Sequence, residues 1–280
     1  MKTLLFFILA LLVIVTSGCA GQKNKKKLAY VERPAETIYL DGYDRMARKD
    51  WARSILLFDE VERQHPYSEW ARRAILMSAY ASYEANKYDE AITAASRFVA
   101  LHPGSRSTPY AYYLIAVSQF EQIRDVGRDQ GKTAEALAAL QQVVRRFPNS
   151  EYARDARLKI DLTKDQLAGK DMEVGRFYLH QGNTLAAINR FRNVVTEYDT
   201  TSHVPEALHR LVESYIILGI MDEAIQVAAV LGYNYPGSDW YQDSYELLAK
   251  TGGLQAVQQL DETDPVKRKN FFKRAWGRLF

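Results

Sequence analysis

The sequence predicts an all-α protein, a superhelical solenoid of about five similar helical hairpins. One observation is a unit at residues 172–199, which reads as two short amphipathic helices around a Gly182-Asn183 turn. A hairpin of this kind cannot bury its apolar face alone, so it implies stacked neighbours. The other observation is a recurring separation of twelve residues between the small residue of a second helix and the residue that ends it. The five pairs are Ser54 and Pro66, Ala91 and Pro103, Ala136 and Pro148, Ala187 and Asp199, and Ala224 and Pro236.

Within the clearest unit, small residues mark the place where the two helices should meet. Gly175 lies in the first helix and Ala187 in the second, and we expect them to let the two backbones approach closely. Tyr178 and Phe191 should then fill the space beside that contact.

The segments between hairpins carry matching stop and start signals. Proline cannot continue the hydrogen-bond ladder of a helix, and a serine after it can cap the next helix by accepting from a free amide. The spacing and the residue types resemble the tetratricopeptide repeat, whose period is about 34 residues. The signals are Pro66-Tyr67-Ser68, Pro103-Gly104-Ser105, Pro148-Asn149-Ser150 and Pro236-Gly237-Ser238.

Composition sets outer bounds on function. The chain has 280 residues, of which 47% are hydrophobic and 25% charged, as in an ordinary folded protein with ample core. A net charge of +3 is too small to argue for a nucleic-acid partner. The single cysteine excludes an internal disulfide.

The N-terminus reads as a lipoprotein signal peptide over residues 1–18. Lys2 precedes an apolar run from Leu4 to Val15, which is short for a membrane span and typical of a signal-peptide core. The run ends at Thr16-Ser17-Gly18-Cys19, which resembles the bacterial lipobox although Thr16 stands where leucine is usual. We therefore expect a covalent lipid on Cys19 and a stable membrane anchor. An ordinary signal peptide or an uncleaved anchor is the alternative.

The lipidated segment, residues 19–35, reads as a flexible tether, because it has no apolar period and carries the Lys25-Lys26-Lys27 run. Ala20 follows the cysteine in place of the aspartate that often signals retention in the inner membrane. Delivery to the outer membrane is therefore favoured.

The remainder divides into three parts. Residues 36–149 hold repeats one to three, and the third carries an insertion from Arg124 to Lys132. Residues 150–250 hold a long connecting helix, with Gly169 as the expected point of any bend, and repeats four and five. Residues 251–280 form a basic aromatic tail that could cap the last repeat, meet an acidic partner or lie on anionic headgroups.

The sequence predicts no enzyme, no metal site and no cofactor other than the lipid. Gly131-Lys132-Thr133 ends like a phosphate-binding loop, but Gly127 is one residue too close and the context is helical. His203 and His209 lack further ligands at metal spacing. The acidic pairs Asp89-Glu90 and Asp222-Glu223 recur at helix starts, where they favour the helix dipole.

Over nearly all of its mature length, the chain is similar to the BamD family of lipoproteins, also called YfiO or ComL. The resemblance rests on residues 147–152, which run into the long helix, on Leu162 to Leu167, and on Val174 to Tyr178 with Asn189-Arg190. The Asp125 to Asp129 insertion also matches a loop of that family.

This resemblance implies a non-enzymatic scaffold of the β-barrel assembly (BAM) complex, lipid-anchored on the periplasmic face of the outer membrane. It implies a POTRA domain of the barrel protein BamA, other BAM lipoproteins and unfolded outer-membrane proteins as partners, and no nucleic acid. The scaffold would help to recognise, fold and insert outer-membrane proteins. The family's C-terminal repeats meet the POTRA domain, so Asn189 and Arg190 are the implied contact residues.

The family's proposed substrate groove lies in the N-terminal repeats. A solenoid also offers a concave surface suited to extended peptides. Tyr80, Tyr83, Tyr112 and Tyr113 could anchor a partner there, although core packing explains each of them as well. The alternative function is another envelope repeat lipoprotein, an adaptor for cell division or for peptidoglycan.

Overall fold

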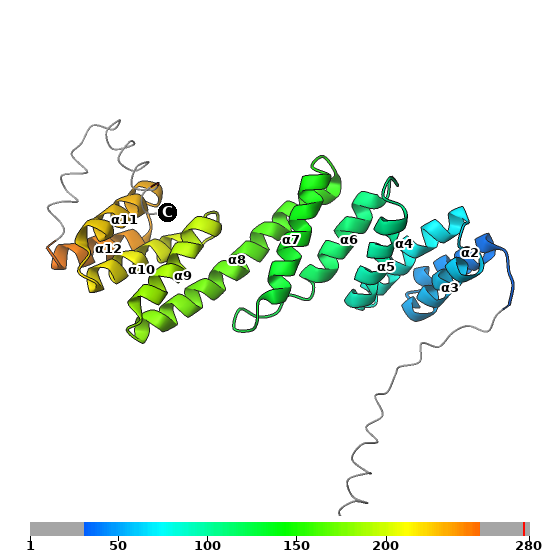
Figure 1. The fold of residues 1–280 in the computed structure, drawn as a ribbon, viewed down its shortest axis with the longest axis horizontal. Coiled ribbons are helices and arrows are strands. Elements are labelled where there is room, and N and C mark those ends of the chain that lie inside the picture. The colour runs from blue at the N-terminus through cyan, green and yellow to red at the C-terminus, as the bar shows by residue number, and fades with distance from the viewer. Residues whose placement is uncertain (1–30, 253–276, 278–280) are drawn as a thin grey trace, which may run out of the picture. The chain divides into compact units, whose positions relative to one another are not determined.

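The computed structural model describes residues 31–252 and residue 277, and every regular element in that part of the chain is an α-helix, as the sequence predicts (Figure 1). Residues 1–34 and residues 35–280 form separate units, and the helices belong to the second. The helices are α2 (Ala35–Ala47), α3 (Trp51–Gln64), α4 (Glu69–Glu84), α5 (Tyr88–Leu101), α6 (Thr108–Phe120), α7 (Gly131–Arg146), α8 (Glu151–His180), α9 (Thr184–Glu197), α10 (Val204–Ile217), α11 (Met221–Asn234) and α12 (Asp239–Lys250).

Consecutive helices pair into the five predicted hairpins, from α2–α3 to α10–α11, and α12 follows the last of them. Each helix contacts the helix before and after it, and first helices of successive hairpins also touch, as α2 touches α4 and α4 touches α6. These nearest-neighbour contacts are those of a tetratricopeptide-like solenoid. The fold class is therefore confirmed.

Four of the five hairpins turn in the same way. One residue of each turn adopts a left-handed backbone, with φ of 59° at Lys49, 56° at Asn86, 75° at Gly182 and 73° at Gly219. In the fourth hairpin the Gly182 amide donates to Leu179 O at 3.0 Å, and the Asn183 amide donates to Tyr178 O at 2.9 Å. This pair of bonds is a Schellman-type helix end, which satisfies carbonyls that the helix leaves free.

The segments between hairpins follow the predicted stop-and-cap pattern with one exception. The hydroxyls of Ser68, Ser150 and Ser238 accept from amides in the first turns of α4, α8 and α12, which confirms three caps. The expected cap at Ser105 is wrong, because α6 begins only at Thr108 after Ser107. Ser105 Oγ instead accepts from the Ser107 amide at 3.2 Å and shapes the turn that leads into the helix.

The insertion of the third hairpin is displaced from the predicted bounds. Helix α6 ends at Phe120 and α7 begins at Gly131, so the loop covers residues 121–130 instead of 124–132. The Asp125 and Asp129 side chains accept from the Gly127 and Gly131 amides, at 2.8 and 3.1 Å, which makes two tight local turns.

A ring-on-glycine contact closes the fourth hairpin. A Cβ on Gly175 would lie 2.5 Å from Phe191 Cε1, so this glycine makes room for the phenyl ring itself. The expectation that Phe191 fills space beside a backbone contact is corrected accordingly. The first hairpin repeats the arrangement, since a Cβ on Gly42 would lie 2.9 Å from Phe58 Cε1. Both phenylalanines are fully buried.

The predicted long helix is α8, which runs 30 residues without interruption through Gly169. Its first half contributes Ala156 to a cluster with α6 and α7, and its second half contributes Met172 to a cluster with α9 and α10. Gly169 packs beside His203, and a Cβ there would lie 3.4 Å from His203 Nε2, an ordinary van der Waals distance, so space does not require glycine at this position.

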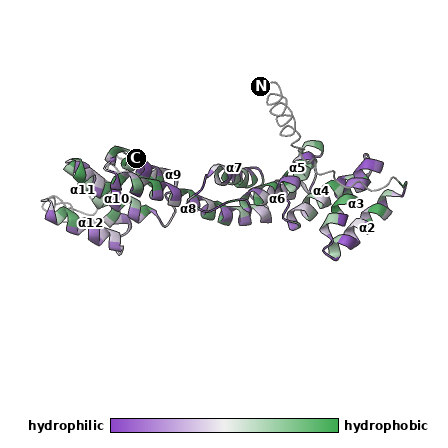
Figure 2. Cartoon of the chain, turned by 90° about the horizontal axis from the view of Figure 1, so that it is seen from below, coloured by the Kyte–Doolittle hydropathy of each residue, from purple (hydrophilic) through white to green (hydrophobic). Residues whose placement is uncertain are grey.

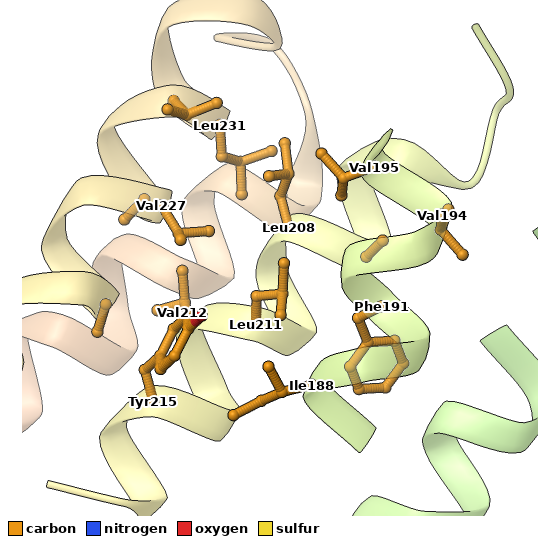
Figure 3. Close-up of a cluster of buried hydrophobic side chains, with 14 of the residues drawn as sticks. Ile188, Phe191, Val194, Val195, Leu208, Leu211, Val212, Tyr215, Val227 and Leu231 are labelled. Atoms are coloured by element: carbon orange, nitrogen blue, oxygen red, sulfur yellow. The ribbon is translucent and has the colours of Figure 1, made fainter. Parts of the chain in front are cut away.

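The largest core cluster joins the last two hairpins (Figure 3). Figure 2 shows apolar and polar residues interleaved along each helix, as expected for amphipathic helices that bury one face. The labelled side chains of the cluster are Ile188, Phe191, Val194 and Val195 of α9, Leu208, Leu211, Val212 and Tyr215 of α10, and Val227 and Leu231 of α11.

Helix α12 is held to α10 by a buried histidine. His209 Nδ1 lies 2.8 Å from Ser244 Oγ, and that hydroxyl donates to Trp240 O at 2.8 Å. The serine oxygen is thus left to accept, so the proton of the neutral ring lies on Nδ1. Burial lowers the pKa of His209, and the nearby Arg210 lowers it further against the opposing effect of Glu213, Asp243 and Glu206.

Gly175→Ala tests the ring-on-glycine contact. The added methyl must displace the Phe191 ring, and overpacking of this kind costs about 1–3 kcal/mol, against a gain of up to ~1 kcal/mol in helix propensity. We expect a lower midpoint of urea unfolding, partly restored in Gly175→Ala/Phe191→Leu. The matched control is Gly104→Ala, whose Cβ would meet nothing within 4 Å. An unchanged midpoint in Gly175→Ala would contradict the contact.

His209 should make stability pH-dependent. Its pKa is lower in the folded chain than the unfolded value of about 6.5. The unfolded state therefore binds a proton first as pH falls, and the stability contributed by the neutral ring is lost between the unfolded pKa and the folded pKa.

The check is urea unfolding from about pH 8 to about pH 5 on the wild type and on His209→Asn, whose amide can still donate to Ser244. The variant should lose less free energy of unfolding on acidification than the wild type does, and the difference is the part that protonation of His209 causes. Parallel curves for the two proteins would rule out this histidine as the source.

Candidate partner-binding site

The predicted lipid attachment residue, Cys19, lies outside the described residues, as do the signal peptide and most of the tether. The tail beyond Gly252 lies outside them too, apart from Gly277. The remaining predicted site residues, Asn189 and Arg190, lie on α9 and are both exposed.

Arg190 is already engaged within the chain. Its Nη1 lies 3.0 Å from Asp171 Oδ1 on α8, and its side chain is 48% exposed while that of Asp171 is only 8% exposed. A buried carboxylate is costly unless it is paired and hydrogen-bonded. Arg190 is therefore a structural residue of the hairpin as well as a surface cation.

Two further side chains complete this polar cluster. Asn193, one helical turn after Asn189 and Arg190, donates its amide to Asp171 Oδ2. Burial raises the pKa of the Tyr198 hydroxyl, and the negative charge of Asp171 is the next cause of the rise. The cluster is thus arranged around one anionic residue, Asp171. The sequence analysis does not predict this cluster, because Arg190 and Asn193 lie on α9 while Asp171 lies on α8, with a turn between the two helices.

A depression of about 560 Å³ opens at the tips of the last two hairpins. Its apolar wall contains Leu185, which is 68% exposed, and Leu218 of the α10–α11 hairpin. Phe177, Ile217 and Ile220 are also exposed at these two tips. The lining is formed by Tyr178, Gly182, Asn183, Thr184, Leu185, Ala186 and Leu218.

The depression and the polar cluster lie along the same side of the α8–α9 hairpin. Ala186 precedes Arg190 by one helical turn, and Leu185 precedes Asn189 by one turn. On α8, Tyr178 lies seven residues after Asp171, which is about two turns. This side of the hairpin therefore offers a hollow of mixed polar and apolar lining, one helical turn from a partly exposed guanidinium, a combination typical of protein-binding surfaces. We call it the hairpin-four surface.

The tyrosines of the N-terminal repeats are used in packing between helices. Tyr113 donates its hydroxyl to Asp155 of α8 at 2.6 Å, and its ring lies 5.3 Å from that of Tyr152. Tyr83 lies 3.4 Å from a Glu121 oxygen, and burial, with Glu121 next, raises its pKa to about 12. Tyr80 and Tyr112 are half-buried against neighbouring clusters. Packing therefore explains these rings, and each keeps some exposed surface.

Three histidines have structural roles. His65 and His102 cap the ends of α3 and α5, each just before a proline. His203, at the start of α10, lies with its Nε2 3.7 Å from Asp165 Oδ2 of α8. Among the described residues, no group of three or more histidine, cysteine or acidic side chains could hold a metal ion. In the same part of the chain, no helix has the length and apolar character needed to cross a membrane.

The family model described as YfiO, an outer membrane lipoprotein, matches residues 31–231 of this chain. That span covers all five hairpins up to the core of α11.

Three relatives with the name "Outer membrane protein assembly factor BamD" are similar along most of the chain. The protein from Caulobacter vibrioides is 57% identical over 244 residues, which cover 87% of this chain and 80% of the relative. The Rickettsia prowazekii protein is 45% identical over 85% of this chain and 95% of its own. The protein from a serogroup A strain of Neisseria meningitidis is 31% identical, covering 83% and 92%.

Proposed function

The chain belongs to the YfiO family of outer membrane lipoproteins, and from this premise we propose that it is a non-catalytic scaffold of outer-membrane protein assembly. The observation that carries the proposal is the 57% identity to an outer membrane protein assembly factor over 87% of the chain. The membership favours this function over an adaptor for cell division or peptidoglycan.

The proposed position is the periplasmic face of the outer membrane, with the chain anchored by a lipid on Cys19. The apolar segment before this cysteine and the small residues Ser17 and Gly18 support lipidation. Several acyl chains on one residue supply enough buried methylene groups for stable anchoring. The lipid is the only non-protein group the proposal requires.

The proposed main partner is a POTRA domain of a BamA-type barrel protein, docked on the hairpin-four surface. Asn189 and Arg190 would contact it, and the hollow whose apolar wall Leu185 and Leu218 form would receive a side chain of the partner. An arginine beside a hollow is a frequent source of binding energy, because its planar guanidinium binds carboxylates in a fixed geometry.

The N-terminal repeats are proposed to receive unfolded outer-membrane proteins, and other BAM lipoproteins would complete the assembly. Tyr80 and Tyr83 on α4 and Tyr112 and Tyr113 on α6 are half-buried, so each keeps an exposed part of its ring for contact with a bound segment. Helices α4 and α6 are the first helices of successive hairpins. Recognition and positioning, with no covalent chemistry, are what this arrangement would supply.

Replacing Cys19 by serine tests the anchor. Serine lacks the thiol that accepts the lipid, so the variant should leave the membrane fraction after washing with high salt. Mass spectrometry of the N-terminal peptide should show acyl chains in the wild type only. A wild-type protein without acyl chains would contradict the lipid anchor and leave the assembly role to be judged separately.

A pull-down of tagged full-length protein from outer membranes tests the BamA contact. Arg190→Glu alone would be ambiguous, because it would place a second carboxylate against buried Asp171. The informative variant is Asp171→Asn/Arg190→Gln, which removes both charges and leaves neither buried and unpaired. We expect BamA recovery to fall at least about tenfold, as for loss of ~1.4 kcal/mol or more at an interface arginine.

Asp171→Asn is the matched control, because it keeps the guanidinium while breaking the ion pair. It should recover more BamA than the double variant does, because the guanidinium remains. If both variants fold and both retain BamA, Arg190 is not part of the contact. If the wild type recovers other envelope proteins without BamA, the assembly function itself is wrong.

A further inference from the structure

Helix α12 begins as the first helix of a hairpin does, but no second helix follows it in the part of the chain that the structure describes. It starts after the capping serine Ser238, as α4 starts after Ser68. At its C-terminal end Gly252 has φ of 85°, the left-handed backbone that marks the turn of four hairpins. In those hairpins the chain reverses there and returns beside the first helix. The end of α12 therefore resembles the turn of a sixth hairpin.

Counting from the capping serines shows which side of α12 a second helix would cover. In α4 the seventh and eleventh residues after the cap are Ile75 and Ala79. Both are buried, Ile75 in a cluster with Phe98 of α5 and Ala79 in a cluster with two alanines of the same helix. In α12 the corresponding residues are Tyr245 and Ala249. Tyr245 is half-buried and Ala249 is exposed, so this side of α12 retains apolar surface.

Helix α8 provides a comparison, because its first half also follows a capping serine, Ser150, while α9 packs against its second half. The same two positions of α8 hold Arg157 and Asp161, and both are exposed. Charged side chains are usual where a helix faces solvent. The tyrosine and the alanine of α12 differ from them and agree with the covered positions of α4. These residue types therefore favour a segment that covers α12.

Acidic side chains lie beside this apolar side. Asp239 and Glu246 of α12 are both exposed. They precede Ala249 by ten and three residues, which places both within about 80° of it around the helix and on the same flank. We call Tyr245 and Ala249, together with these two acids, the α12 face.

The region around α12 is acidic even when every basic side chain is counted. Residues 204–252, which contain the fifth hairpin and α12, hold seven acidic and two basic side chains, a net charge of −5 with neutral histidine. Of the two basic residues, Arg210 is paired with acids of its own helix, and Lys250 lies 3.9 Å from Glu246. Residues 265–280, in contrast, hold six basic side chains and no acidic one. The two segments are thus complementary in charge. The acids are Glu206, Glu213, Asp222, Glu223, Asp239, Asp243 and Glu246, and the six basic residues are Lys267, Arg268, Lys269, Lys273, Arg274 and Arg278.

Residues 265–280 also carry an apolar stripe. Asp264-Pro265 supplies an N-cap and a first-turn proline, so the sequence predicts a helix from this point. Gly277, which the structure describes, is helical and exposed. In such a helix Gly277 lies on the side opposite the stripe, so its exposure agrees with a stripe that faces the protein. The stripe consists of Phe272, Ala275, Trp276 and Leu279.

We propose that residues 265–280 of this chain form a basic helix that lies on the α12 face. Its apolar stripe packs against Tyr245 and Ala249, and Lys269 and Lys273, which lie beside the stripe, pair with the two acids of the face. Covered in this way, the last hairpin presents a polar outer surface, which the end of a solenoid requires.

The chain's own tail is favoured over a separate partner by its tether. Residues 253–264 can span up to ~40 Å, which exceeds the length of α12, about 18 Å for its 12 residues. A segment held by so short a linker has an effective concentration of about millimolar at its site. An anionic membrane surface is disfavoured as the occupant, because the acids of the α12 face would repel its headgroups.

The test is photo-cross-linking in cells with p-benzoyl-phenylalanine in place of Trp276, in the full-length protein. We expect a cross-link within the monomer, mapped by mass spectrometry to residues 239–250. Asp239→Lys/Glu246→Lys should reduce the yield at least about fivefold, because two charge pairs would become repulsive. Adding Lys269→Glu/Lys273→Glu to that variant should restore the yield, which would also show that α12 is still folded.

Two matched controls locate the effect. The same probe at Gly277, on the other side of the helix, should not produce the cross-link to residues 239–250. Asp89→Lys, which reverses an exposed acid in the first turn of α5 as Asp239→Lys does in α12, should leave the yield at Trp276 unchanged.

The proposal is wrong if the probe at Trp276 reaches phospholipid, another protein, a second copy of this chain or another part of the same chain in place of residues 239–250. It is equally wrong if charge reversal on α12 leaves the yield unaltered. Because the cross-link forms within one chain, loss of the BamA contact at Arg190 would not affect it. The two experiments therefore fail independently.

Discussion

Close contact between the two helices of a hairpin is the interaction on which the other features of this fold depend. Where the ring of Phe191 lies directly on Gly175, no Cβ separates the ring from the opposing helix, and the fully buried Phe58 occupies the same place over Gly42. Protein interiors are packed as densely as organic crystals, so a large residue on one helix requires a small one opposite. That complementarity sets the separation of the helices, and the shared Schellman-type turn then determines where the second helix begins.

Helix α8 shows what happens when this repeat is extended without a break. Its first half completes the cluster of α6 and α7, while its second half forms the hairpin with α9. One helix thus serves as the end of one stack and the beginning of the next. The hairpin-four surface follows from that arrangement, because it lies at the tip of the hairpin that the second half of α8 makes with α9.

Most of the fold could be predicted from the sequence, because its signals are local. The twelve-residue separation, the prolines and three of the serine caps each act within a few residues of where they stand. Ser105 was misassigned because Pro109, four residues later, sits in the first turn of the helix and moves its start to Thr108. The pairing of Arg190 with Asp171, and the hydrogen bonds from Gln166 and Lys170 to loop carbonyls, join residues 19 to 43 positions apart. No helical period encodes such pairs, because they depend on how separate elements pack in the folded chain.

The ion pair at Arg190 does not disqualify this residue from binding a partner. A guanidinium carries five N–H donors in a planar fork, and nearly half of this side chain remains exposed while one terminal nitrogen contacts Asp171. The pair restricts the rotamers of a long side chain, so less conformational entropy is lost when a second acceptor arrives. Asp171 would repel an incoming carboxylate, but Asn193 donates to the other Asp171 oxygen and shares that charge. Asp171 therefore holds Arg190 in position but weakens its attraction for a carboxylate of the partner. A neutral acceptor on the partner, such as a carbonyl oxygen, would bind the oriented guanidinium without being repelled by Asp171.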